Sequence, residues 1–234
     1  GSSGVPIPNT EVKIGDNGIV YMKNNAIFSA YLHEEDQKQV VDGWLSLGDH
    51  GYLDELGHLH ILDRQEDVIT NINGEIIYPR LVENELKSSP YIQEAVCFGK
   101  EKPYMTAILN IDMNSVGRWA DKNRILYTEY SDLSRNPKVV ELIEQQVEQL
   151  MSKLSPQNRV KKFSILHKQF TADQGELTRT LKIRRNFVEQ KYKILLDGMY
   201  SDTQEVSLTS SQMESVEEEV SLRVIQLKIE QGVA

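Results

Sequence analysis

An aspartate, an arginine and a lysine occur where each could bind part of a nucleotide. Asp49 lies in GDHG, where two glycines predict a tight turn, and its carboxylate can accept hydrogen bonds from both hydroxyls of a ribose. Arg64 follows the apolar run HLHILD, and a guanidinium there can bind a ribose or a phosphate. Lys182, in ELTRTLKIRR, follows a polar loop near the start of a predicted helix, where an ammonium stabilises charge developing on a carboxylate and a phosphate.

Each of these residues also has a purely structural interpretation. Asp49 can cap a turn, and Lys182 can be a solvated residue at a basic helix end. Arg64 can form a surface ion pair with Asp63 or Glu66. Only the joint occurrence of these three residues with the Asn73-Gly74 hairpin, in the order Asp49, Arg64, hairpin and Lys182, favours a nucleotide site.

Histidines at two places in the chain are further candidates for chemical roles. His58 and His60 alternate along a predicted strand and would lie on one face, as a metal-binding pair would. No third ligand has suitable spacing, so we predict a solvated strand face and no metal site. His167 and Lys168 end a later strand and are predicted to lie at the surface.

Composition and charge narrow the class of protein. The chain has 234 residues, 39% of them hydrophobic and 26% charged, and no apolar run approaches the roughly 20 residues of a membrane span. Peripheral membrane contact stays open. The single Cys97 excludes a disulfide framework and favours the reducing cytoplasm. The net charge of −9 disfavours nonspecific nucleic-acid binding, although residues 159–193 carry ten Lys or Arg against three Asp or Glu, which suits a polyanionic small molecule.

The elements that would position these residues indicate an α+β protein. Residues 1–63 are predicted to be β-rich, and residues 64–200 to form a small domain with a mixed or antiparallel sheet and flanking helices. Residues 201–234 are predicted to be a linker followed by an edge strand or hairpin. The elements expected within the small domain are an Asn-Gly hairpin at 68–78, strands at 92–99, 104–111 and 160–167, and helices from Pro79, at 115–122, from Asn136 and at 183–196.

Four motifs in one order resemble the adenylate-forming superfamily, in particular its bacterial long-chain fatty acid–CoA ligase-like branch. GWLSLGD is similar to the family's Gly-Trp-(Phe/Leu)-x-Thr-Gly-Asp, and LDRQED to its Asp-Arg-x-Lys-Asp. NGEIIYPRLVEN has the branch's Gly-Glu-x-Ile-x-Pro, and LTRTLK resembles its Leu-Thr-x-Thr-x-Lys. The opening GSSGVPIPNTEVKI looks like the stretch that follows the family's adenine-binding motif.

The resemblance implies a role for each matched position. It makes residues 1–63 the end of an N-terminal adenylation domain and residues 64–200 a mobile C-terminal domain. The implied roles are catalysis for Lys182, ribose binding for Asp49 and Arg64, the hinge for Glu66, and the face used in thioester formation for Asn73, Gly74 and Glu75.

The implied reaction has two steps and three small-molecule ligands. A fatty acid carboxylate attacks the α-phosphate of Mg-bound ATP to give acyl-adenylate and diphosphate, and the thiol of coenzyme A then displaces AMP. The family's phosphate loop and magnesium-binding glutamate do not occur in this sequence and would lie upstream of Gly1. We therefore expect no adenylation by this chain alone.

Two departures from the family pattern keep other functions open. Leu47 replaces the usual Thr before Gly-Asp, and Glu66 stands where Lys or Asp is common. Both leave room for a degenerate homologue that acts as a binding module. The acyl acceptor could instead be an acyl-carrier protein, and a nucleic-acid-binding domain would rest on the basic segment alone.

Overall fold

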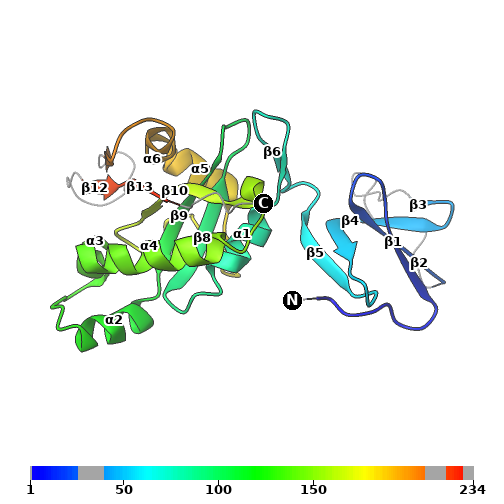
Figure 1. The fold of residues 1–234 in the computed structure, drawn as a ribbon, viewed down its shortest axis with the longest axis horizontal. Helices are drawn as coiled ribbons and strands as arrows, with labels where there is room; N and C mark the ends of the chain where they lie inside the picture. The colour runs from blue at the N-terminus through cyan, green and yellow to red at the C-terminus, as the bar shows by residue number, and fades with distance from the viewer. Residues whose placement is uncertain (1, 26–39, 209–219, 229–234) are drawn as a thin grey trace. The chain divides into compact units, whose positions relative to one another are not determined.

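The computed structural model describes residues 2–25, 40–208 and 220–228, which belong to two compact units (Figure 1). The first unit is Gly1–Val68 and the second is Ile69–Ala234. In the described part of the first unit the regular elements are all strands, whereas the second unit combines strands and helices.

The first unit is an antiparallel sheet, and the alternating apolar residues within 1–63 predict that this region is β-rich. Its order is β1-β2-β4-β3, and β5 also pairs with β4. The strands are β1 (Thr10–Ile14), β2 (Ile19–Asn24), β3 (Val40–Val41), β4 (Trp44–Leu53) and β5 (Leu59–Arg64).

The turn between β4 and β5 is organised by Asp54. Its carboxylate accepts hydrogen bonds from the backbone N–H groups of Leu56 (3.0 Å) and His58 (2.8 Å). The second oxygen lies 3.1 Å from Nδ1 of His58 and 3.1 Å from Nε2 of His60. These bonds, led by that of the His58 N–H, lower the pKa of Asp54. Both histidines therefore serve the turn, and the described residues contain no group of three side chains suited to a metal ion.

The second unit is built on a mixed four-stranded sheet, which confirms the predicted α+β class. The order is β13-β10-β9-β8, with β10 parallel to β9 and the other neighbours antiparallel. The strands are β8 (Ile92–Phe98), β9 (Met105–Ile111), β10 (Val160–Ile165) and β13 (Ile225–Gln226).

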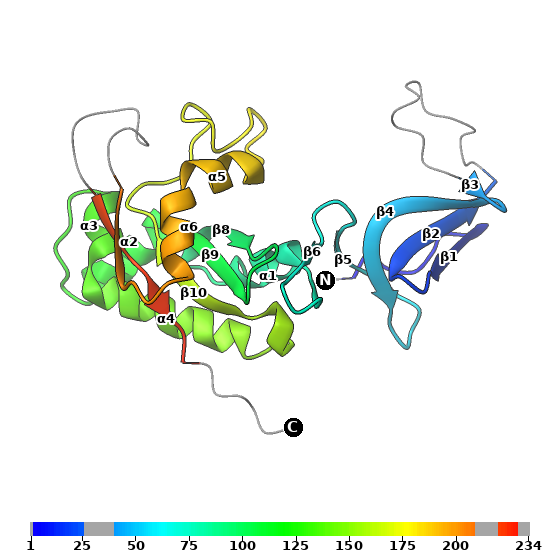
Figure 2. The same cartoon turned by 90° about the horizontal axis from the view of Figure 1, so that it is seen from above.

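Helices cover both faces of this sheet, with α4 on one side and α5 and α6 on the other (Figure 2). They are α1 (Pro79–Leu86), α2 (Met113–Lys122), α3 (Tyr130–Arg135), α4 (Pro137–Met151), α5 (Arg185–Lys191) and α6 (Lys193–Met199), with a 3₁₀ turn at Pro156–Asn158. Asn136 begins α4 as predicted, because its side chain accepts a hydrogen bond from the Lys138 N–H.

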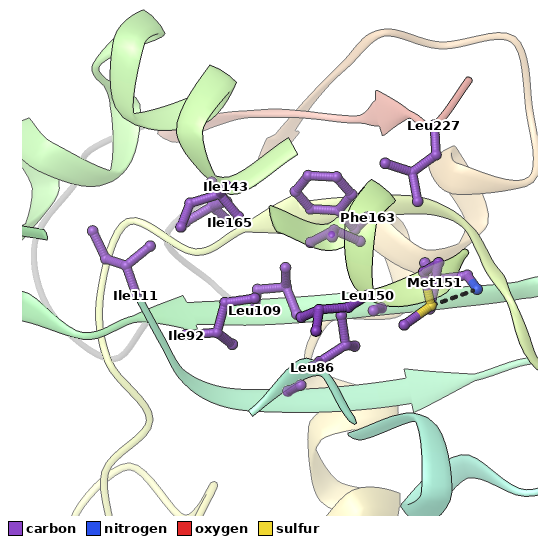
Figure 3. Close-up of a cluster of buried hydrophobic side chains, with 14 of the residues drawn as sticks. Leu86, Ile92, Leu109, Ile111, Ile143, Leu150, Met151, Phe163, Ile165 and Leu227 are labelled. Atoms are coloured by element: carbon purple, nitrogen blue, oxygen red, sulfur yellow. Dashed lines mark hydrogen bonds between the residues drawn. The ribbon is translucent and has the colours of Figure 1, made fainter. Parts of the chain in front are cut away.

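The period of two along each strand divides the apolar residues between two cores. In β8, Ala95 and Cys97 belong to the core beneath α1 and α4, whereas Val96 and Phe98 belong to the core beneath α5 and α6. Figure 3 shows the first core, in which the sulfur of Met151 accepts a hydrogen bond from the backbone N–H of the residue that opens β10. The sheet therefore lies between two apolar cores.

The helical end of the second unit differs from the prediction in two ways. The predicted helix 183–196 is two helices, α5 and α6, because the chain leaves helical geometry at Tyr192 (φ −103°, ψ 22°). The short helix α3 was not predicted. It begins where Asp132 accepts hydrogen bonds from the N–H groups of Thr128 and Glu129, a local signal that six residues without a long apolar stripe do not reveal.

The tail adds strands to the second unit. β11 (Glu205–Leu208) and β12 (Val220–Arg223) pair antiparallel, and the adjoining β13 extends the sheet at β10. Four apolar side chains of this hairpin are buried in the core beneath α5 and α6: Val206, Leu208, Val220 and Leu222. The described part of the tail is thus packed against the domain.

Candidate functional site

Asp49 and Arg64 are brought together in the first unit. They are cross-strand partners in the β4–β5 pair, and Nε of Arg64 lies 3.1 Å from a carboxylate oxygen of Asp49. The Asp49 side chain is 19% exposed and that of Arg64 is 46% exposed, so both remain accessible. The predicted surface pairing of Arg64 with Asp63 or Glu66 is replaced by this pairing with Asp49.

Asp49 lies within strand β4, which corrects the prediction of a tight glycine turn. Gly48 has φ +70°, and the β4–β5 register shifts between His50 and Gly51, so the strand is bent and does not end. A Cβ on Gly51 would lie 2.5 Å from the backbone oxygen of His60. The two glycines therefore permit a bulge and a close strand approach.

Glu66 lies in the turn that follows β5. Its side chain is exposed, and the boundary between the two compact units falls two residues later, between Val68 and Ile69. A turn residue at a unit boundary is where a change in backbone dihedrals can reorient a domain.

Asn73, Gly74 and Glu75 lie at the exposed tip of the hairpin formed by β6 (Ile69–Thr70) and β7 (Ile76–Ile77). The tip belongs to a five-residue loop, residues 71–75, that begins at the buried Asn71. The side-chain oxygen of Asn71 accepts hydrogen bonds from the N–H groups of Asn73 and Glu75, both at 2.9 Å. Gly74 supplies the positive φ of +79° that the loop requires.

Lys182 lies at the end of a tight turn that precedes α5. The turn is closed by a bridge between Leu177 and Ile183 and by hydrogen bonds between Thr178 and Lys182 in both directions: Thr178 N–H to Lys182 O (2.7 Å) and Lys182 N–H to the Thr178 hydroxyl (3.0 Å). The Lys182 side chain is exposed, and its ammonium forms no ion pair with a residue that the structure describes. It is therefore available to a ligand.

Leu181 explains why glycine suits the position before this lysine. Its φ is +59°, in the left-handed region that ordinary residues avoid, and its side chain is 74% exposed. The predicted family pattern often has Ser-Gly there, and this chain instead has Thr-Leu. The turn therefore holds Leu181 at a positive φ, although leucine prefers a negative φ.

Part of the basic segment 159–193 is used inside the domain, which corrects its interpretation as a ligand-facing surface. Lys168 and Lys191 lie 3.5 and 3.1 Å from the buried carboxylate of Glu176. Lys162 donates to the backbone oxygen of Ser201, and Arg185 pairs with a glutamate of α1. His167 is half-buried as well, so the predicted surface position of His167 and Lys168 is wrong.

Three supporting residues escaped the sequence prediction: Asn71, Glu83 and Glu176. Asn71 has a local signal, because an Asx residue two positions before Asn-Gly favours a side-chain-capped loop. Glu83 and Glu176 have none, since their partners are distant in sequence or enter from several elements.

Comparison with known proteins gives the family. Residues 66–204, more than half of the chain, match the family described as AMP-binding enzyme C-terminal domain. The chain belongs to that family. The predicted resemblance to adenylate-forming enzymes is thereby confirmed.

Two curated relatives of this chain are named long-chain-fatty-acid–CoA ligases. FadD15 of Mycobacterium tuberculosis is 31% identical over 204 residues, which cover 86% of this chain and 34% of the relative. ACSBG2 of Rattus norvegicus is 31% identical over 205 residues, which cover 79% of this chain and 31% of the relative. The chain thus spans about a third of the length of these relatives.

Solved structures share the fold of this chain. O-succinylbenzoate coenzyme A synthetase of Bacillus subtilis, in complex with AMP, is 25% identical with a TM-score of 0.51, over 80% of this chain and 34% of that one. The adenylation domain of a carboxylic acid reductase from Segniliparus rugosus, solved with AMP and a carboxylic acid, is 16% identical with a TM-score of 0.61, over 84% and 32%. No described helix is long and apolar enough to cross a membrane.

Proposed function

We propose that this chain is the C-terminal third of an ATP-dependent long-chain fatty acid–CoA ligase. The observation that carries the proposal is the 31% identity to long-chain-fatty-acid–CoA ligases over 86% of the chain. The whole reaction joins a fatty acid to coenzyme A through an acyl-adenylate, with ATP converted to AMP and diphosphate. The single cysteine of the chain, Cys97, is buried, which suits a protein of the reducing cytoplasm.

Lys182 is the catalytic residue of the proposed adenylation step. Its exposed ammonium, which pairs with no residue in the described ranges, would contact the carboxylate and the α-phosphate oxygens and stabilise the negative charge that develops between them. No covalent enzyme intermediate forms, so the contribution of the lysine is positioning and charge stabilisation.

Asp49 and Arg64 hold the ribose of the nucleotide in this proposal. The pair is preorganised across two strands, so one hydroxyl-binding carboxylate and one guanidinium are presented together. Because an ion pair already fixes both side chains, little rotamer entropy is lost when the ribose binds.

Glu66 and the loop 73–75 act in the second half-reaction. Rotation about the turn that contains Glu66 would exchange the Lys182 turn for the exposed loop of Asn73, Gly74 and Glu75. The thiol of coenzyme A then displaces AMP. Magnesium would enter with ATP, held mainly by the phosphates, and the proposal gives no residue of this chain the role of a metal ligand.

The test is the Lys182→Ala variant of the full-length protein, assayed separately in each half-reaction. The rate of adenylation, measured as fatty-acid-dependent ATP–diphosphate exchange, should fall by about 100-fold or more, as when an electrostatic stabiliser is removed. Thioester formation from supplied acyl-adenylate and coenzyme A should stay within about twofold, because the lysine acts only in the first step.

Two results would contradict the proposal. Equal loss of both half-reactions would remove the assigned role of Lys182. If the wild-type protein adenylates fatty acids but transfers them only to an acyl-carrier protein, the acceptor is that carrier protein and not coenzyme A.

A further inference from the structure

We propose that Glu176 is a positioning residue that fixes the orientation of the turn carrying Lys182. The inference deepens the proposed function and rests on it, because it concerns how the catalytic lysine is held. Glu176 directly precedes that turn and does not itself face a ligand, since its side chain is fully buried.

The carboxylate of Glu176 joins three parts of the second unit. One oxygen accepts hydrogen bonds from the Tyr192 hydroxyl (2.8 Å) and the Lys191 ammonium (3.1 Å), at the junction of α5 and α6. The Lys168 ammonium, after β10, lies 3.5 Å from the same oxygen. The other oxygen accepts from the Thr171 N–H at 3.0 Å. The side chain therefore ties the loop to the sheet and to the helices.

The backbone of the same residue closes the base of the turn. The Glu176 carbonyl accepts a hydrogen bond from the Arg184 N–H at 2.9 Å, and the next residue forms the bridge with Ile183. Gly175 allows the chain to enter here, because its φ is +80° and a Cβ would lie 2.9 Å from the ring of Phe187. Glu176 thus anchors the segment that enters the Lys182 turn, and its carbonyl holds the segment that leaves it at Arg184.

The negative charge of Glu176 is stabilised by the groups that surround its carboxylate. Burial alone would raise the pKa of Glu176, but the Thr171 N–H, the Tyr192 hydroxyl and the ammonium groups of Lys168 and Lys191 outweigh it and lower the pKa. The carboxylate is consequently ionised at neutral pH. The two lysine side chains are only 21% and 10% exposed, so removal of the negative charge would leave two half-buried ammonium groups without compensation.

The test is Glu176→Gln in the full-length protein, which preserves side-chain volume and removes the charge. Adenylation should fall by about 10- to 100-fold, the scale of a displacement of about 1 Å at a reacting centre, while thioester formation from supplied acyl-adenylate stays within about twofold. Ile143→Val, in the opposite core, is the control for general destabilisation and should not separate the two half-reactions. Hydrogen exchange at the Arg184 amide should accelerate by at least about tenfold in Glu176→Gln only.

Equal loss of both half-reactions, or unchanged adenylation, would overturn the role of Glu176. If Glu176→Gln does not fold, Tyr192→Phe removes a single donor and should give the same selective loss at a few-fold scale; absence of that loss also overturns the inference. Lys182→Ala separates this failure from that of the proposed function. Selective loss in Lys182→Ala without selective loss in the Glu176 variants leaves the ligase assignment standing and rejects only the anchor.

Discussion

Glu83 of α1 and Arg185 of α5 form a bidentate ion pair across the second unit. The guanidinium nitrogens lie 2.6 and 3.0 Å from the two carboxylate oxygens. Both residues also bond the backbone of Cys97 in β8, whose N–H donates to Glu83 at 2.8 Å and whose carbonyl accepts from Arg185 at 2.7 Å. Helix α1 follows the loop 71–75, and Arg185 lies three residues after Lys182. The ion pair therefore links the helix next to that loop with the helix next to the Lys182 turn.

Removal of one partner of this pair should destabilise the second unit. Glu83→Gln removes the negative charge that faces the Arg185 guanidinium, whose side chain is 25% exposed, so the free energy of unfolding should fall by about 2 kcal/mol. Denaturant unfolding followed by Trp119 fluorescence in a Trp44→Phe background reports on this unit alone.

An exposed ion pair supplies the control for the Glu83 variant. Lys153→Ala breaks the 3.1 Å contact with Glu85, in which the lysine is 57% exposed, and should cost less than about 0.5 kcal/mol. Similar losses for Glu83→Gln and Lys153→Ala would show that burial gives the Glu83–Arg185 pair no special weight.

Substitutions at Leu181 should shift stability in opposite directions. Leu181→Gly removes the strain of a left-handed leucine and little burial, so the unfolding free energy should rise by about 0.5 kcal/mol after the entropy of the unfolded glycine is deducted. Leu181→Val places a β-branched residue at the same positive φ and should lower it by about 1 kcal/mol. Thermal unfolding of the second unit measures both.

Leu126 is a matched control for Leu181. It is 96% exposed but has no positive φ, so Leu126→Gly should be destabilising by about 0.5 kcal/mol through unfolded-state entropy alone. A stabilising Leu126→Gly would mean that backbone strain is not the reason for the gain at Leu181.

The local elements of this protein follow from its sequence, whereas the contacts around the candidate residues do not. Alternating apolar residues predict that residues 1–63 are β-rich, but the pairing of Asp49 with Arg64 depends on a bulge at Gly51 that sets the register. Periodicity predicts α4, but not the break at Tyr192, whose hydroxyl is held by the buried Glu176.

The same distinction applies to charge. Ten basic residues in the segment 159–193 predict a cationic surface, yet Lys168, Lys191 and Arg185 bond carboxylates within the fold. Net charge along a sequence cannot reveal which side chains are neutralised, because the neutralising carboxylate of Glu83 lies about a hundred residues away from Arg185.

His167 should titrate far below an ordinary histidine. Burial, assisted by the charges of Lys168 and Arg135 and opposed by Glu176, lowers its pKa from 6.5 to about 4. The folded state therefore stays neutral at a pH where the unfolded state takes up a proton. The stability that this ring contributes is complete above pH 6.5 and is lost as the pH falls toward 4.

The measurement is an NMR titration of the His167 ring, assigned with His167→Gln. The wild-type ring should show an apparent pKa near 4, and between pH 7 and 5 the wild type should lose about 1 kcal/mol more unfolding free energy than the variant, after allowance for partial exposure. A ring that titrates near 6.5 would contradict the buried, neutral state.

A charged substitution at Asn71 should make the loop 71–75 sensitive to pH. The Asn71 amide nitrogen donates to the Glu75 carboxylate at 2.6 Å, so Asn71→Asp places two carboxylates in contact while it keeps the acceptor for the Asn73 and Glu75 N–H groups. At neutral pH, repulsion should destabilise the loop by about 1–2 kcal/mol, seen as faster hydrogen exchange at those two amides. One carboxyl of the pair acquires a raised pKa, so protonation restores the loop as the pH falls below about 5.

Asn71→Asp combined with Glu75→Gln should recover protection of the two amides at neutral pH, because a donor again faces an acceptor. Continued fast exchange in the double variant would mean that the amide of Asn71, and not charge balance, holds the loop.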